Sequence, residues 1–388
     1  MIKLGNRFQL IVMMDGKEIP LEHMGFDALQ MHSNVMFYQP VGRIVIADRI
    51  KWFDANPIGD GAKVDIFVGT NEVVTEANLY RFRLFRYSVT KVNNVNYYTL
   101  FLAFNCPRYF NENVTGAITG SSYDALQGIA KTIGVKFKGD PTSDSQIWIG
   151  QGKKRCVFAR DIALHGWSGT TSCMSLGMTL LGEMRYVDIS AIKARDTENY
   201  FVMGAGDNES VFRVLGRKEL SKAGLVNNMV GYKMETVEQS PDGNTNHNSV
   251  TVTMNSAPTL SVNKTLNDQL EGSRVAFTPI SAGNTHPNFY KAKHNNRRLR
   301  AMYSYGSHIA TDGLTGLDLF DPVKFLFYDN TTSDTLLNQA VSGTYIITAK
   351  TIFATKEGRY FEKLEIVRQG VNYYSGLVPA ITTHNSAR

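Results

Sequence analysis

The amino-acid sequence predicts a mainly β fold with α+β inserts, in which one β-barrel domain lies towards each end of the chain. Short runs rich in Val, Ile, Phe and Tyr, separated by turn residues, occupy both ends. Between them, apolar residues recur at helical spacing over a shorter stretch. The length of 388 residues exceeds the usual size of one hydrophobic core, so several domains are expected.

The first predicted barrel domain covers residues 1–112. Gly or Asn, for which positive φ is least costly, stands between its strands at Asp15-Gly16, Gly59–Gly61 and Asn93-Asn94. Such spacing favours hairpins, and the sequence therefore predicts an antiparallel barrel or sandwich. The predicted strands include Phe8–Met13, Arg43–Ala47, Val64–Val68 and Tyr97–Phe104.

Residues 113–195 are predicted to form an α+β insert domain. Ser121-Ser122 can cap a helix that ends at Gly134, and its apolar positions are Leu126, Ile129, Ala130 and Ile133. A second helix is expected over Lys154–His165, with Gly166 as its C-terminal stop. Strand sequence returns over Leu180–Ile189.

The remaining sequence divides into three parts. Gly, Ser and Asn cluster near 239–249, next to the alternating stretch 250–254, so residues 196–300 are predicted to form a mixed connecting domain. Residues 301–375 are predicted to form the second barrel domain, and 376–388 a frayed C-terminal tail. The expected strands of this barrel are Val323–Tyr328, Gly343–Phe353 and Tyr360–Arg368, with a turn at Lys356–Gly358 between the last two.

The composition is that of a folded globular protein, with 43% hydrophobic and 20% charged residues. A net charge of +6 does not by itself imply a nucleic-acid partner, because 35 acidic residues nearly balance 41 basic ones. No apolar stretch is long enough for a membrane helix, and the N-terminal residues lack the pattern of a signal peptide. We expect no stable membrane insertion.

The three cysteines, Cys106, Cys156 and Cys173, lie far apart and outside any CxxC spacing. This arrangement indicates neither a disulfide framework nor a zinc site. We expect free, mostly buried thiols in a protein made in a reducing cytoplasm.

Motifs that carry catalysis are missing or incomplete. Neither Gly16-Lys17 nor Gly152-Lys153 follows the upstream Gly of a phosphate-binding loop. The stretch Gly166–Gly169 lacks the GxSxG spacing that would make Ser168 a nucleophile.

Two further patterns have simpler explanations than catalysis. The eight histidines form no HExxH or HxH pair, and His165 beside Trp167 fits a capping or packed residue at a helix end. Ser88 and Lys91 match SxxK but fall in strand sequence, where they point to opposite faces. The sequence therefore predicts no catalytic residue, no cofactor-binding residue and no metal site.

Two basic stretches can be explained without nucleic acid. Arg81–Arg86 alternates Arg with aromatic residues, which describes a half-buried strand whose other face meets water or a partner. Lys291–Arg300 is typical of the solvated side of a helix. We expect no specific nucleic-acid binding.

Three passages carry a resemblance to a known family. The first is Gly61–Gly69, a Gly followed by alternating Val and Ile. The second combines Ser122–Ala130, Ile147–Ile149 and Cys156–Gly166, and the third pairs Val341–Ile347 with Tyr360–Gly370. In these passages the sequence resembles the baseplate hub proteins of contractile-tailed bacteriophages, which are related to the N-terminal hub part of type VI secretion spike proteins.

The resemblance implies two tail-tube-like β-barrel domains per chain, and a homotrimeric ring with pseudo-sixfold symmetry. Such a hub adapts a sixfold tail tube to a threefold spike and anchors the surrounding baseplate proteins. Edge pairing between subunits would protect the exposed strand edges of the barrels. The implied role is structural, with no turnover.

The implied partners are the tail spike or tip protein, the tail tube or tube-initiator protein, wedge or other baseplate proteins, and the tape measure protein in the lumen. The implied location is the virion, in the tail baseplate, after synthesis in the host cytoplasm. Because DNA passes through such a lumen during ejection, the Lys and Arg excess is expected on outward surfaces. A lumen lined by Arg81, Arg83 and Arg86 would refute this expectation.

Alternatives stay open at the level of sequence. One is a tail-associated enzyme that degrades the cell wall, and another is a tail module that binds host glycans through exposed aromatic side chains. Within the structural class, the chain could also serve a non-contractile tail.

Overall fold

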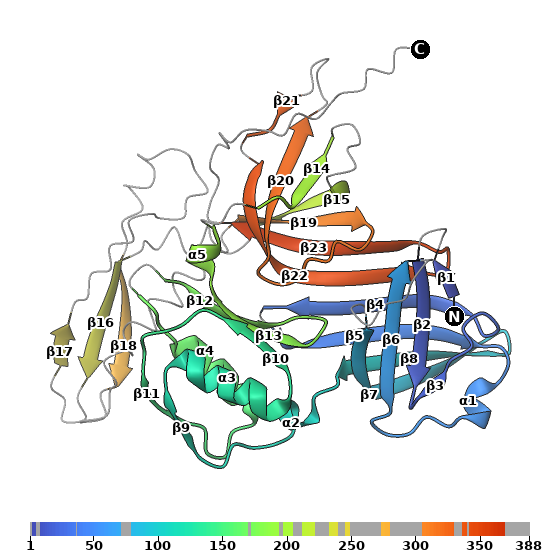
Figure 1. Cartoon of the computed structure of the whole chain (residues 1–388), viewed down its shortest axis with the longest axis horizontal. Helices are drawn as coiled ribbons and strands as arrows, with labels where there is room; N and C mark the ends of the chain where they lie inside the picture. Colours follow the sequence, from blue (N-terminus) through green and yellow to red (C-terminus); the bar gives the residue numbers. More distant parts are fainter. Residues whose placement is uncertain are drawn as a thin grey trace.

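The computed structural model describes residues 2–4, 8–35, 37–70, 79–169, 172–193, 197–204, 212–221, 233–239, 245–248, 273–279, 305–329, 336–339 and 341–368. Figure 1 shows two strand-rich units beside a smaller unit that contains the longer helices. One 15-stranded sheet runs through both strand-rich units. The predicted mainly β architecture with an α+β insert is confirmed.

The N-terminal unit, barrel 1, is an antiparallel sheet. Its order is β1, β2, β6, β7, β8, β5, β4, and each neighbouring pair is antiparallel. As predicted, Asn93 and Asn94 both take positive φ (47° and 63°) in the turn between β7 and β8. The elements are β1 (Ile2–Leu4), β2 (Phe8–Met14), β3 (Lys17–Glu18), β4 (Phe26–Asn34), β5 (Phe37–Asp48), α1 (Trp52–Ala55), β6 (Lys63–Thr70), β7 (Leu79–Val92) and β8 (Val95–Phe104).

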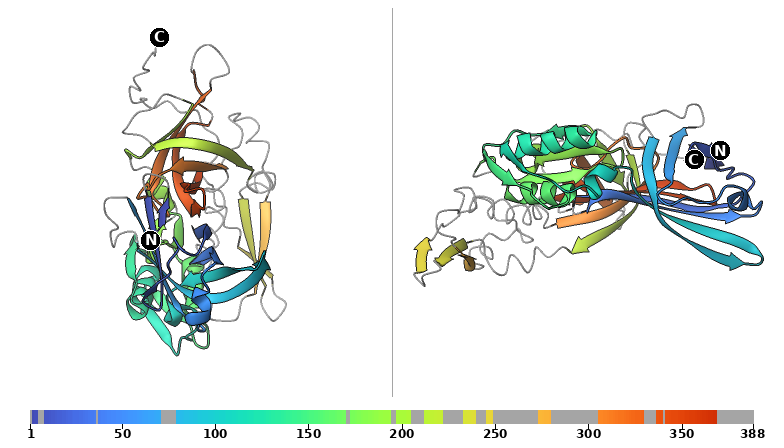
Figure 2. Two further views of the ribbon diagram at one scale, coloured as in Figure 1. Left: turned by 90° about the vertical axis from the view of Figure 1, so that its right-hand side faces the viewer. Right: turned by 90° about the horizontal axis from the view of Figure 1, so that it is seen from below.

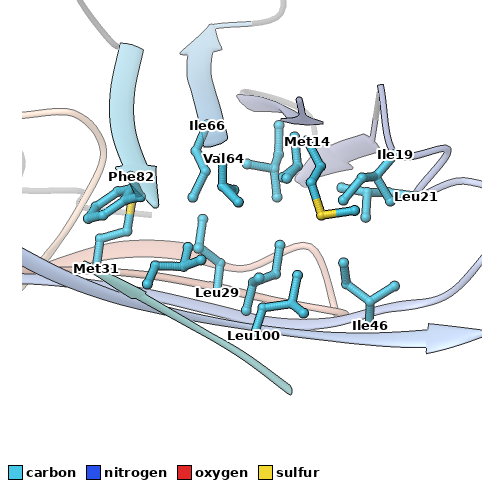
Figure 3. Close-up of a cluster of buried hydrophobic side chains, with 14 of the residues drawn as sticks. Met14, Ile19, Leu21, Leu29, Met31, Ile46, Val64, Ile66, Phe82 and Leu100 are labelled. Carbon is cyan, nitrogen blue, oxygen red and sulfur yellow. The ribbon is translucent and has the colours of Figure 1, made fainter. Parts of the chain in front are cut away.

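The core of barrel 1 follows from the alternation of side chains along these strands. On β7, Tyr80, Phe82 and Leu84 are buried, whereas Arg81 between them is exposed. In Figure 3, Val64, Ile66 and Phe82 face Leu29, Met31, Ile46 and Leu100 across the core. Burial of these apolar side chains is the main term that stabilises the unit.

The insert places two helices over a small sheet. The helix α3 (Ser122–Ile133) starts with a capping box, in which the Ser121 hydroxyl accepts from the Asp124 backbone N–H, and ends at Gly134 with φ 77°. Figure 2 shows α3 and α4 side by side over β10, β12 and β13. The remaining elements are α2 (Pro107–Phe110), β9 (Ala117–Gly120), β10 (Lys136–Gly139), β11 (Gln146–Ile149), α4 (Arg155–His165), β12 (Met174–Met178), β13 (Glu183–Asp188) and α5 (Ile189–Lys193).

Gly166 follows the second predicted helix, but it does not adopt the left-handed conformation of a typical C-terminal glycine. Its φ is −71°. A Cβ at this position would lie 1.8 Å from the Tyr186 hydroxyl and 2.9 Å from the Ser122 hydroxyl. Gly is therefore required here by close packing against the small sheet rather than by a helix-ending turn.

The second unit, barrel 2, is a closed ring of six strands. The ring order is β14, β20, β22, β23, β19, β15 and back to β14. The strands of this unit are β14 (Tyr200–Met203), β15 (Phe212–Ser221), β19 (Tyr305–Asp312), β20 (Pro322–Asp329), β21 (Leu336–Leu337), β22 (Gly343–Thr355) and β23 (Tyr360–Arg368).

Two strands of barrel 2 fall outside the range predicted for it. The predicted domain began at residue 301, whereas β14 and β15 belong to the predicted connecting domain 196–300 and complete the ring. The physical reason is closure: Phe201 and Val214 are buried in the same core as Ile309 and Tyr345. Since β14 has only four residues, its sequence alone carries too short a pattern to reveal this pairing.

The remaining described strands of the range 196–300 form a separate three-stranded sheet. They are β16 (Lys233–Gln239), β17 (Thr245–Asn248) and β18 (Ser273–Pro279), in the order β17, β16, β18. The alternating stretch 250–254 and the tail 376–388 lie outside the described residues.

The two barrels share one strand plan. When β2, β4, β5, β6, β7 and β8 are matched in chain order to β14, β15, β19, β20, β22 and β23, each of the ladders that join these six strands in barrel 1 has a counterpart in barrel 2. The β14–β15 ladder, which closes barrel 2, has no β2–β4 counterpart among the described residues. The direction of one strand differs, because β2 is antiparallel to β6 whereas β14 is parallel to β20.

The positions of the β-bulges show that the two barrels also correspond residue by residue. Equivalent bulges lie at Asp27 and Leu215, where β4 meets β5 and β15 meets β19. A second equivalent pair lies at Phe85 and Thr348, where β7 meets β8 and β22 meets β23.

A third ladder checks this alignment independently. When the two barrels are aligned so that the bulged residues match, Ile44 becomes equivalent to Ile309, and Leu100 becomes equivalent to Leu364. Ile44 pairs with Leu100 in barrel 1, and Ile309 does pair with Leu364 in barrel 2. Because β-bulges are characteristic features of a fold and not random defects, their matching positions indicate that the two barrels are versions of one structural unit.

Candidate functional site at the barrel junction

Strand β22 joins the two barrels by changing its partner part-way along its length. Gly343–Ile346 pair with β20 and close barrel 2. Beyond the bulge at Thr348, Ala349–Thr355 pair with Ala28–Asn34 of β4, so barrel 1 continues directly into barrel 2. Figure 1 shows β4 and β22 side by side. We call this β4–β22 ladder the barrel junction.

The inner face of the barrel junction belongs to the core of barrel 1. Ile352 and Ala354 of β22 are almost fully buried beside Leu29 and Met31 of β4, and Tyr360 of β23 packs with them. The two units therefore share apolar core as well as backbone hydrogen bonds, and they are expected to stay associated as one body.

A buried ion pair lies on the same inner face. The Lys350 ammonium is 3.1 Å from Glu362 Oε1 and donates to the Leu317 carbonyl at 2.7 Å. Glu362, which is fully buried, also accepts from the Thr315 hydroxyl at 2.6 Å and from the Tyr360 hydroxyl at 3.3 Å. Desolvation and the nearby Glu362 carboxylate raise the pKa of Tyr360, so this phenol stays protonated.

A second set of charged side chains connects the insert to the loop 313–321 beside the barrel junction. Arg185 of β13 donates to the Leu319 carbonyl at 2.6 Å, to Asp321 at 2.9 Å and to Glu183 at 2.6 Å. Asp318 is buried nearby, and burial raises the pKa of its carboxyl group. The loop 313–321 thus contacts barrel 1, barrel 2 and the insert.

A pocket of about 860 Å³ opens where these three units meet. Its lining mixes acidic and basic side chains, including Arg81, Lys136, Glu183, Arg185 and Glu362. Within the described part of the chain, no group of three or more His, Cys, Asp or Glu residues could hold a metal ion. Lys350, Glu362 and Arg185, which take part in the ion pairs described above, belong to the lining of this pocket.

The residues of the incomplete catalytic motifs form hydrogen bonds with backbone groups close by. The Ser168 hydroxyl donates to the Pro141 carbonyl at 3.1 Å. His165 Nδ1 lies 2.7 Å from the Asp161 carbonyl of its own helix, and the Trp167 N–H donates to Asp144. His165 therefore interacts with the end of α4, as expected for a capping residue.

The basic strand has the predicted half-buried form. Arg83 donates to Asn105 at 2.7 Å and to the Gly61 carbonyl, while the Arg86 guanidinium lies 4.3 Å from the centre of the Phe101 ring. Ser88 and Lys91 both lie on β7, in its exposed distal half. The stretch Lys291–Arg300 lies outside the described residues.

The cysteines are free thiols, as the sequence predicted. Cys106 and Cys173 are buried and Cys156 is partly buried. Burial raises the pKa of the Cys106 thiol. No helix in the described part is long and apolar enough to span a membrane.

Sequence reasoning missed the residues of the barrel junction. Lys350 stands inside the apolar run Tyr345–Phe353, and Glu362 alternates with apolar residues on β23. A charge inside such a run is a usable signal, because an isolated buried charge is costly and needs a partner. The sequence does not reveal which partner that is.

Comparisons with solved structures place this fold. The chain is similar to a tail protein of Neisseria meningitidis MC58, with a TM-score of 0.57, 10% identity, and coverage of 94% of this chain and 97% of the other. It is equally similar to the 43 kDa tail protein of prophage MuSo2 from Shewanella oneidensis, with a TM-score of 0.58, 10% identity, and coverage of 94% and 99%. The chain has the fold of phage tail proteins.

The tail-protein fold extends over nearly the whole chain, so it includes both barrels and the insert. A component of the Escherichia coli type VI secretion system is a further match, with a TM-score of 0.48, 8% identity, and coverage of 95% and 80%. No family model matches the sequence, and no curated protein matches it either. The resemblance to tail proteins inferred from sequence is confirmed at the level of fold.

The buried ion pair of the barrel junction gives a first prediction. Lys350→Met should lower the free energy of unfolding by about 3–5 kcal/mol, because it leaves the Glu362 carboxylate buried without its cation. The double variant Lys350→Met/Glu362→Gln should recover part of that loss. Denaturant unfolding of the wild type, both single variants and the double variant measures the coupling. Additive losses would show that the pair contributes no specific interaction.

The barrel junction also predicts a pH dependence. His32 Nδ1 lies 2.8 Å from the Thr351 hydroxyl across the β4–β22 ladder. Its pKa is lowered by burial and by Lys363 and His308, against an opposing effect of Glu365. The folded state therefore binds fewer protons than the unfolded state below pH about 6.5, and stability should fall as the pH falls through that region.

Thermal unfolding between about pH 7.5 and pH 5 tests this effect. The difference in stability between the wild type and His32→Gln should shrink on acidification, since glutamine does not titrate. The exposed His165 provides a matched control as His165→Gln. A constant difference between wild type and His32→Gln across this range would contradict the assignment.

Proposed function

We propose that this chain is a structural phage tail protein that acts as the central hub of the baseplate. The observation that carries the proposal is the internal duplication: one chain holds two versions of the same barrel, already joined through β4 and β22. Two equivalent barrels per chain suit a trimer that presents six equivalent positions on one side and three on the other. Such a ring can adapt a sixfold tail tube to a threefold spike.

The proposed partners follow from that geometry. The tail tube or tube-initiator protein contacts one face of the ring, and the spike or tip protein contacts the other. Wedge or other baseplate proteins attach around the outside, and the tape measure protein occupies the lumen before genome ejection. The protein acts in the virion, in a contractile tail, after synthesis in the host cytoplasm.

Oligomeric state and shape test this proposal directly. Mass photometry of the purified chain, alone and with tube and spike proteins, should give a species of three times the 43.3 kDa chain mass. Negative-stain images should show a ring of six lobes with an open centre. A chain that stays monomeric even with both partners present would overturn the proposal.

The proposed role involves no turnover, and this is a separate prediction. Ser168 and His165, the residues nearest to a catalytic pattern, hold local backbone structure instead. A peptidoglycan zymogram of the purified protein should show no clearing, beside a muralytic enzyme as the positive control. Clearing at the position of this chain would identify it as an enzyme of the tail.

A further inference from the structure

We propose that neighbouring copies of this chain join through β7 of one copy and β15 of the next, in an antiparallel ladder that repeats the barrel junction. This inference rests on the proposed ring and adds the two strands and the register that build it. The duplication supports this ladder, because the equivalents of β7 and β15 are β22 and β4, the two strands that pair inside the chain.

Both proposed strands have an available edge among the described residues. The strand β7 pairs with β6 only as far as Arg83, and beyond that point its described partner is β8 alone. The strand β15 pairs with β14 only at Phe212 and Arg213, and from Val214 to Ser221 its described partner is β19 alone. Free backbone groups along such edges are a template for pairing with another chain.

The edge of β7 loses its pairing with β6 at the position equivalent to the one where β22 changes its partner from β20 to β4. Pairing of β22 with β20 ends at Ile346, two residues before the bulge at Thr348. Pairing of β7 with β6 ends at Arg83, two residues before the bulge at Phe85. The distal half of β22 then pairs with β4, whereas the distal half of β7 extends away from barrel 1, as Figure 2 shows.

The surface of the two edges is apolar enough for an interface. Phe85 is 75% exposed, Leu215 is 55% exposed, and Tyr87, Val89 and Val92 are each nearly half exposed. These five are among the eleven large hydrophobic side chains that are exposed in the described part of the chain. Four of the five lie on β7 from its bulge at Phe85 onward, and Leu215 lies at the bulge of β15. This concentration of exposed apolar groups on β7 indicates contact with protein rather than with water.

The duplication fixes the register of the proposed ladder. Thr351 pairs with His32 inside the chain, and their equivalents are Ser88 and Leu220. The same alignment places Val89 opposite Glu219 and Lys91 opposite Arg217. Glu219 lies on the diagonal to Lys91 and is 3.3 Å from Arg217 within its own chain, so it lies between the two cations.

Repetition of this contact gives a closed assembly. The surface of β7 differs from that of β15, so the contact is head-to-tail, and it forms a ring when the rotation closes. The barrel junctions within chains and the proposed β7–β15 ladders between chains then alternate around the ring with equivalent geometry. The proposed occupant of each of these two edges is a second copy of this chain.

Cysteine cross-linking in the full chain tests the register. Ser88→Cys/Leu220→Cys should form disulfides between copies under mild oxidation, because directly opposed strand residues meet disulfide geometry. Non-reducing gels should then show covalent dimers and closed trimers. The matched control, Ser88→Cys/Lys218→Cys, is displaced by two residues along the same strand and should cross-link far less.

The outcomes separate this inference from the proposed function. Cross-linking of the first pair with little in the control supports the β7–β15 ladder. Rings of three chains without cross-links, or with equal cross-linking in both pairs, overturn the ladder and leave the proposed hub intact. A chain that stays monomeric with tube and spike proteins overturns both.

Discussion

Strand β22 must satisfy backbone hydrogen bonds in two barrels, and the rest of the structure is arranged around that requirement. Its first part closes barrel 2 against β20, and its second part pairs with β4 of barrel 1. The bulge at Thr348 separates the two parts. Since buried peptide groups need partners, neither barrel can move away from the other without breaking this ladder.

A set of buried polar groups lies beneath the ladder and links the residues around it. Lys350 and Glu362 are buried together, and Thr315 and Tyr360 supply further hydrogen bonds to the carboxylate. Removal of either partner alone would leave an uncompensated buried charge, so the two side chains depend on each other. With Arg185 of the insert bound to the same loop, the charges fix three units in a single arrangement.

In the proposed ring, the duplication reduces the number of different contacts that each chain must make. Barrels with the same strand order and the same bulge positions offer the same edges to their neighbours. One pairing solution can then serve inside the chain and between chains. Such economy fits the fold that this chain shares with phage tail proteins.

Much of the fold was predictable from local patterns in the sequence. The turn at Asn93-Asn94, the capped helix from Ser122 to Ile133 and the half-buried strand around Phe82 each depend on residues close together in the chain. Local sterics, capping and alternation decide such elements, so their residues carry the information directly.

The barrel junction could be recognised only from the tertiary structure. His32 and Thr351, which meet across it, are 319 positions apart, and the four residues of β14 close a ring whose other strands mostly lie more than a hundred positions later. The sequence by itself determined the strands, the insert and the absence of familiar catalytic motifs. Only the folded chain decided which edges pair, because backbone hydrogen bonds carry no side-chain code and any free edge can in principle accept any strand.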